Sequence, residues 1–157
     1  MEPIRVLQWG LGAMGSGMVR LMLEKSGIKV VAVIDSRPDY VGKDLGDVLG
    51  IGKKLGVIIT DKPADVLKKE AVDVAVLATT SWVSEQMGDL RKVITAGINC
   101  ISIAEEMADP YAQSPALAAE LDQLAKKHGI SVLGTGVNPG FVLDLLVVLL
   151  SGGNSTI

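Results

Sequence analysis

The sequence has 157 residues, of which 48% are hydrophobic and only 3% aromatic, and its formal net charge is −3. A chain of this size can bury one ordinary core without disulfides, and an aliphatic core is typical of buried parallel strands covered by helices. The negative charge and the scattered Lys and Arg residues exclude the basic field of a nucleic-acid-binding protein, so we expect no nucleic-acid partner.

Short β-branched runs alternate along the chain with longer segments of helical periodicity. Helices are predicted from the glycine-rich segment to about Lys25, over residues 81–96, over 115–128, and as a short helix within the loop 37–56. The runs predict strands at residues 4–9, 30–34, 57–60, 72–78, 99–103 and 131–133. This order predicts an α/β doubly wound parallel sheet, the Rossmann NAD(P)-binding fold, as a single domain over residues 1–150 with a flexible tail at 151–157.

The first predicted strand ends in the glycine-rich motif Gly10-Leu11-Gly12-Ala13-Met14-Gly15, which also opens the first predicted helix. In this context Gly10 permits a tight turn, Gly12 lets the backbone approach a pyrophosphate, and Gly15 lets the helix pack close to the strand. The free N–H groups and positive dipole end of the helix would then face the phosphates. The motif therefore predicts a site for a nicotinamide dinucleotide.

An acidic residue, Asp35, closes the second predicted strand and is followed by Ser36 and Arg37. A carboxylate at this place accepts hydrogen bonds from the ribose hydroxyls of the adenosine and repels a 2′-phosphate, which favours NAD. Arg37 can stack on adenine or pair with a 2′-phosphate, so NADP remains possible as the cofactor. The alternative for Arg37 is a solvated loop charge.

Further candidate residues follow the later strands, because ligands of open α/β sheets bind at the carboxyl ends of the strands. A glutamate beside a nicotinamide can pair with an ammonium ion and carry its proton, whereas the alternative is a solvated pair of loop carboxylates. No metal site is expected, and Cys100 is expected to be a core side chain. The candidates are Thr79, Thr80 and Ser81, then Glu105 and Glu106, and finally Asn138, Pro139 and Gly140.

Four segments, 7–15, 34–38, 102–107 and 134–141, together resemble the N-terminal domain of the 2,4-diaminopentanoate dehydrogenases and native amine dehydrogenases, and more distantly of the dihydrodipicolinate reductases. The resemblance runs to about Leu150. It implies an enzyme that oxidises a carbon bearing an amine, passes hydride to the nicotinamide and releases ammonia. It also implies that the segment beginning at Thr79 lies along the ribose and nicotinamide, and that the segment beginning at Asn138 closes over the ring.

The resemblance places a contact to the substrate amine on the glutamate pair, with Glu105 slightly favoured over Glu106. Family members continue into a second domain that supplies much of the pocket for a small amine or amino-acid substrate and usually the subunit interface. We expect that domain to be absent here, so that cofactor binding survives better than turnover. Two alternatives stay open: a nucleotide-binding or interaction module without catalysis, and a reductase like dihydrodipicolinate reductase.

Residues 141–150 form the longest apolar stretch, which Asp144 interrupts and which is about half the length needed to cross a bilayer. With a single cysteine and no secretory signal, the sequence predicts a cytoplasmic protein without a membrane segment. As a helix that is apolar on nearly every side, this stretch should be exposed in part and should make the chain associate, most simply as a homodimer.

Overall fold

The computed structural model describes residues 2–153 and contains one six-stranded sheet in which all neighbouring strands are parallel. The strand order is β3-β2-β1-β4-β5-β6, which confirms the predicted doubly wound Rossmann fold. The strands are β1 (Ile4–Trp9), β2 (Ile28–Ile34), β3 (Ile59–Thr60), β4 (Val74–Leu77), β5 (Asn99–Ser102) and β6 (Val132–Gly134).

Three strands are shorter than predicted, β5 by one residue and β3 and β4 by more, and hydrogen bonds give the reason for β3 and β4. Val72 is buried in the core, but its N–H donates to Lys68 O in the turn before β4, so the strand begins two residues later. Val57 O accepts from Leu45 N, which ties residue 57 to the preceding loop instead of the sheet. An apolar pattern cannot separate a buried turn residue from a strand residue.

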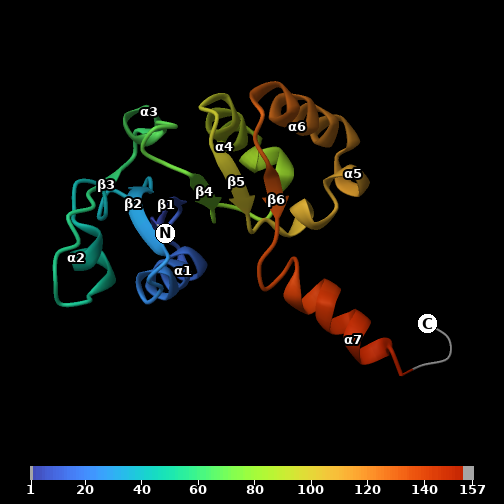
Figure 1. The fold of residues 1–157 in the computed structure, drawn as a ribbon, viewed down its shortest axis with the longest axis horizontal. Coiled ribbons are helices and arrows are strands. Elements are labelled where there is room, and N and C mark those ends of the chain that lie inside the picture. The colour runs from blue at the N-terminus through green and yellow to red at the C-terminus, as the bar shows by residue number, and fades with distance from the viewer. Residues whose placement is uncertain (1, 154–157) are drawn as a thin grey trace.

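The predicted helices are present, and Figure 1 shows α1 on one side of the sheet and α4 and α6 on the other. Three further elements, α3, η1 and α5, were not predicted because each is four residues long and too short to show a period. The helices are α1 (Ala13–Leu23), α2 (Leu45–Leu49), α3 (Pro63–Val66), α4 (Val83–Thr95), η1 (Glu105–Ala108), α5 (Pro110–Gln113), α6 (Pro115–His128), η2 (Phe141–Leu146) and α7 (Val147–Ser151).

Aliphatic side chains build two cores, one on each face of the sheet. The larger lies under α4 and α6 and includes Leu77, Leu90 and Ile94, all fully buried. The smaller lies under α1 and α2 and includes Val19 and Leu45. Each fully buried Leu contributes about 1.5–3 kcal/mol to the stability of the fold. These cores fix the carboxyl ends of the strands, where the predicted site residues lie.

Cys100 is a core side chain, as predicted. Burial raises the pKa of its thiol to about 12, so it stays protonated and unreactive.

The chain after β6 leaves the sheet as the helical segments η2 and α7 (Figure 1). Its apolar side chains are exposed: 68% of Val148, 66% of Leu149 and 75% of Leu150 are accessible to solvent. The expected apolar helix with uncovered faces is therefore present. No helix in residues 2–153 is long and apolar enough to cross a membrane. Of the predicted tail, residues 154–157 lie outside the described part of the chain.

Candidate functional site

The three glycines of the motif 10–15 have different surroundings. A Cβ on Gly10, whose φ is +92°, would lie 2.4 Å from Ala78 O, and a Cβ on Gly15 would lie 2.0 Å from Gly10 O. The fold itself therefore requires both of these glycines. A Cβ on Gly12 would meet no heavy atom of the described residues within 4 Å. Open space beside an exposed backbone is what the approach of a ligand requires.

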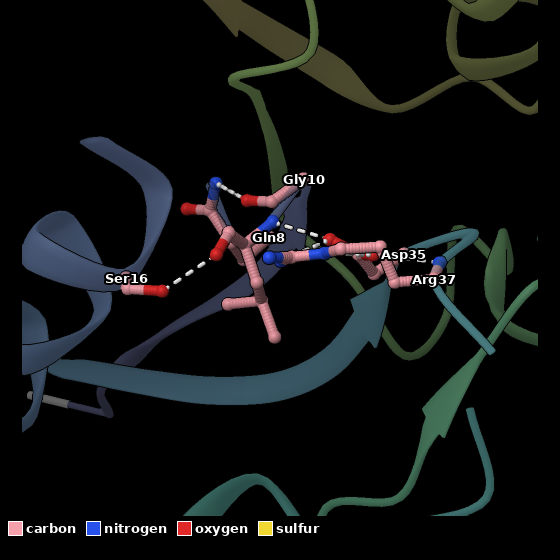
Figure 2. Close-up of polar contacts among 6 residues, drawn as sticks. Gln8, Gly10, Ser16, Asp35 and Arg37 are labelled. Carbon is pink, nitrogen blue, oxygen red and sulfur yellow. Dashed lines mark hydrogen bonds and ion pairs between the residues drawn. The ribbon is translucent and has the colours of Figure 1, made fainter. Parts of the chain in front are cut away.

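The N-terminus of α1 opens at Gly12 and carries no side-chain cap and no acidic residue in its first turn. Two side chains hold the turn in place by hydrogen bonds to its carbonyl groups. Gln8 Nε2 donates to Gly10 O (2.9 Å) and Ser16 Oγ donates to Leu11 O (2.7 Å; Figure 2). The buried Gln8 was not predicted, because a polar residue inside a strand gives no signal of its own. The helix end presents unsatisfied N–H groups and a partial positive charge, which suits an anion.

Asp35 lies next to this turn at the end of β2, and its buried carboxylate is fully engaged within the chain. Leu11 N donates to Oδ2 (2.7 Å), while Arg37 donates from its backbone N and Nε to Oδ1 and from Nη2 to Oδ2, all at 2.9 Å (Figure 2). Burial alone would raise the pKa of Asp35, but the hydrogen bonds from Arg37 and Leu11 outweigh burial and lower that pKa below its usual value. Asp35 is therefore ionised at neutral pH.

The Arg37 guanidinium also lies over the Tyr40 ring, 3.8 Å from the ring centroid. Its ion pair with Asp35 raises the pKa of Arg37 and cancels much of the negative charge that the sequence places at this point. The carboxylate that the sequence predicts to repel a 2′-phosphate is thus paired with Arg37. Here the two side chains form one nearly neutral, hydrogen-bonded unit.

A cavity of about 580 Å³ adjoins the glycine turn on the side of Asp35. Asp61 and Lys92 also line it and were not predicted. Asp61 directly follows β3, so the rule that ligands bind at the carboxyl ends of the strands, the strand-end rule, points to it. Lys92 lies in the third turn of α4, where no sequence pattern marks it. Among the predicted residues, this first cavity brings together Gly10, Gly12, Asp35, Ser36, Arg37 and Thr79.

A second cavity, of about 460 Å³, lies on the α1 side of the sheet. Met14 and Met18 of α1 form one wall and Ile101 and Ile103 form another, so the lining is largely apolar. Glu105, the sole carboxylate in this lining, also borders it. Asn138 and the residues before it, from Thr135 onward, complete the lining from the loop after β6.

The two predicted catalytic glutamates have separate environments. Glu106 turns toward α4, where its Oε2 accepts a hydrogen bond from Val83 N (2.8 Å), and its own N–H donates to Ser81 O (3.2 Å). It thereby supplies the cap that the N-terminus of α4 lacks from its own residues. Glu105 is exposed and borders the second cavity. Of the pair, Glu105 alone borders one of the two cavities.

Several predicted residues lie in the described structure outside both cavities. Thr80 Oγ1 donates to the Glu85 carboxylate, so this residue contacts the first turn of α4. Pro139 is buried, and Gly140 has φ +109°, with only 2.8 Å between its Cβ position and Thr135 Oγ1. Thr80, Pro139 and Gly140 therefore support the loops around the two cavities but line neither cavity. The remaining ones are Leu11, buried beneath the glycine turn, Ala13 and Gly15 of α1, and Ser81.

Residues 4–102 match the model of the family described as dihydrodipicolinate reductase, N-terminus. The chain belongs to this family. Over 154 residues it is 43% identical to the 2,4-diaminopentanoate dehydrogenase of Acetoanaerobium sticklandii, which covers 97% of the chain and 43% of that protein. It is 30% identical to the amine dehydrogenase of Streptomyces virginiae, over 98% of the chain and 43% of that protein.

Among solved structures, the amine dehydrogenase of Mycobacterium smegmatis superimposes with a TM-score of 0.89 at 40% identity, covering 98% of the chain and 45% of that structure. This dihydrodipicolinate reductase family member thus spans less than half the length of the relatives named here. The resemblance inferred from the four sequence segments is confirmed.

Proposed function

We propose that this chain is the cofactor-binding part of an NAD(P)-dependent oxidoreductase that acts on the CH–NH2 group of a small amine or diamino acid, as in the 2,4-diaminopentanoate dehydrogenases. The observation that carries the proposal is the position of the glycine turn between two cavities of different chemistry. Gly12 borders the polar first cavity, and Met14, two residues later, borders the apolar second cavity. A dinucleotide has two dissimilar ends joined by a pyrophosphate, which this arrangement suits.

The residues of the first cavity suit NAD, with NADP possible. Gly12 and the N-terminus of α1 would hold the pyrophosphate, because the backbone is open there and the helix end is uncapped. Asp35 would accept from the adenosine ribose in exchange for a hydrogen bond from the Arg37 guanidinium, and Thr79 borders the same space. When bound, the nicotinamide ring supplies the hydride acceptor.

The second cavity suits an alkylamine. Its apolar walls would hold the carbon skeleton, while the Glu105 carboxylate would pair with the ammonium group and take one of its protons. Loss of hydride from the carbon that bears the amine then leaves an iminium ion on the substrate. Addition of water to that carbon gives the ketone and releases ammonia together with one proton, as ammonium, so atoms and charge balance.

The proposal is tested by the reverse reaction, in which a full-length enzyme that carries this domain oxidises NADH in the presence of ammonia and a small ketone. Ammonia-dependent loss of NADH supports the dehydrogenase. NADH binding without turnover supports the alternative of a nucleotide-binding module. Reduction of a dihydrodipicolinate-type substrate without any dependence on ammonia favours the reductase that the family description suggests.

The Asp35–Arg37 pair leads to a prediction about cofactor choice. We expect the wild-type chain to bind NADH more tightly than NADPH, and Arg37→Ala to widen this preference by about tenfold, the value of one charged hydrogen bond. The variant removes a phosphate-binding group and exposes the Asp35 charge. Calorimetric titration with both cofactors measures the ratio.

Arg91→Ala is the matched control, because it removes the same charge from an ion pair with Glu120 on the surface of α4 and α6. It should leave both affinities unchanged. Wild-type binding of NADPH tenfold tighter than NADH would contradict the expected preference. An equal loss for both cofactors in Arg37→Ala would show that Arg37 does not read the 2′ position.

We further propose that the exposed helical segment η2–α7 pairs two copies of the chain in a cytoplasmic homodimer. Exposed apolar surface of this extent is unusual on a monomer, and two-fold pairing buries the same patch on both copies. Light scattering over a dilution series should show a dimer for the wild type and a monomer for Leu149→Glu. Leu21→Glu on α1, where the side chain is 60% exposed, is the control that should stay dimeric.

A strictly monomeric wild-type chain at high micromolar concentration would reject the homodimer. The cytoplasmic assignment is supported by the single cysteine, Cys100, which is buried and reduced.

A further inference from the structure

Gln86, in the first turn of α4, is a fully buried amide that joins two parts of the site. Its Oε1 accepts a hydrogen bond from Ser102 Oγ (2.5 Å), and its Nε2 donates to Thr79 Oγ1 (3.3 Å). Ser102, also fully buried, accepts in turn from Ala104 N (3.1 Å). A continuous chain of hydrogen bonds thus runs from the start of the turn that carries Glu105 to the wall of the first cavity.

The partners of Ser102 fix the direction of this chain. The Ser102 hydroxyl is buried and its proton needs an acceptor, which among residues 2–153 is the amide oxygen of Gln86, so the amide nitrogen faces Thr79. Each group therefore donates toward the cavity: Ala104 N–H to Ser102, Ser102 O–H to Gln86, and Gln86 N–H to Thr79. Hydrogen bonds aligned in this way polarise one another.

Thr79 is the last member of the chain, and its hydroxyl has one proton to donate. The Gln86 amide donates to Thr79 Oγ1, so Gln86 does not use the proton of the Thr79 hydroxyl. No group within residues 2–153 accepts that proton. Thr79 also packs on the glycine turn, since its Cγ2 lies 3.3 Å from the Cβ position of Gly10. Its side chain is thus held on both sides at the border of the first cavity.

We propose that Gln86 is a positioning residue that fixes Thr79 as a hydrogen-bond donor to an oxygen of the bound dinucleotide. The inference rests on the proposed function, because it takes the first cavity as the cofactor site. With the amide reversed, the Thr79 hydroxyl would donate its proton to Gln86 and offer the cavity only an acceptor, which a phosphate oxygen cannot use as a partner. Ser102 prevents this reversal by donating to the amide oxygen.

A double-mutant cycle tests the proposal, with NADH affinity measured by calorimetry on the intact chain. Thr79→Val and Gln86→Met each remove one link with little change in volume, and each should weaken NADH binding by about tenfold, the value of one hydrogen bond. The double variant should also lose about tenfold and not a hundredfold, because Gln86 acts through Thr79. Thr79→Ser, which keeps the hydroxyl, should bind NADH as the wild type does.

Thr95→Val is the control for a general disturbance of α4, since its hydroxyl bonds only to backbone oxygens of its own helix, and it should not change NADH affinity. Additive losses in the double variant, or unchanged affinity in Thr79→Val, would overturn the inference even if Gln86→Met lowers the melting temperature. A wild-type chain that does not bind NADH would instead overturn the proposed function, and this inference with it.

Discussion

Gly12→Val should abolish binding of both NADH and NADPH while the protein keeps its fold. The backbone of Gly12 has φ −56°, which any residue adopts, and its Cβ position meets no described atom within 4 Å. The valine side chain therefore occupies only the space that the pyrophosphate needs. The loss of the closest charged hydrogen bonds to the phosphates should weaken the binding of both cofactors on the order of 100-fold or more.

The matched control is Gly17→Val, since Gly17 lies on the same helix and a Cβ there also meets open space. It should raise helix stability slightly, because Val has a higher helix propensity than Gly, and leave cofactor affinity unchanged. Gly15→Val, in contrast, should damage the fold itself, because its Cβ would lie 2.0 Å from Gly10 O. Calorimetry and thermal melting separate these outcomes. NADH binding by Gly12→Val within threefold of the wild type would place the cofactor elsewhere.

The sequence predicts the parts of the site that depend on local backbone geometry. The spacing of Gly10, Gly12 and Gly15 predicts three separate roles, and the surroundings of the three residues in the structure differ in that way. The strand-end rule locates Asp35 and Thr79 for the same reason, because parallel strands bring their carboxyl ends to one edge of the sheet. Periodicity and spacing are sufficient wherever neighbours in the chain are neighbours in space.

Side-chain partners distant in the sequence are what the sequence does not predict. Gln86 joins Ser102 and Thr79 only because α4 packs on β5 with that face inward, and a lone polar residue among apolar ones does not reveal this. Asp35 and Arg37 are close in sequence, yet their ion pair forms only with the Arg37 rotamer that also stacks on Tyr40. Such contacts follow from the assembled fold and not from a motif.

The glutamate pair shows the same limit most clearly. Glu105 and Glu106 are adjacent, so spacing gives no reason to divide their roles. The structure does so through Val83, which is 23 positions away in the sequence and offers its N–H to Glu106 alone. Glu105 is left at the border of the apolar second cavity. The two residues should consequently respond to the same substitution in different ways.

In a full-length enzyme that carries this domain, Glu105→Gln should lower kcat for amine oxidation by about 10²–10⁴-fold, the usual contribution of a general acid–base group. The amide keeps the shape of the side chain but can neither pair with an ammonium ion nor take its proton. Cofactor affinity should stay within about threefold, because Glu105 lies outside the first cavity. Steady-state kinetics with separate cofactor titrations distinguishes the two effects.

Glu106→Gln is the matched variant, since it makes the same change one residue away. Its amide oxygen can still accept from Val83 N, so kcat should change little, while loss of the charge at the N-terminus of α4 should lower the melting temperature slightly. A large loss of kcat in Glu106→Gln and none in Glu105→Gln would reverse the assignment within the pair. If both variants kept full activity, the carboxylates would be structural, and the proton would have to leave the substrate through a group outside this turn.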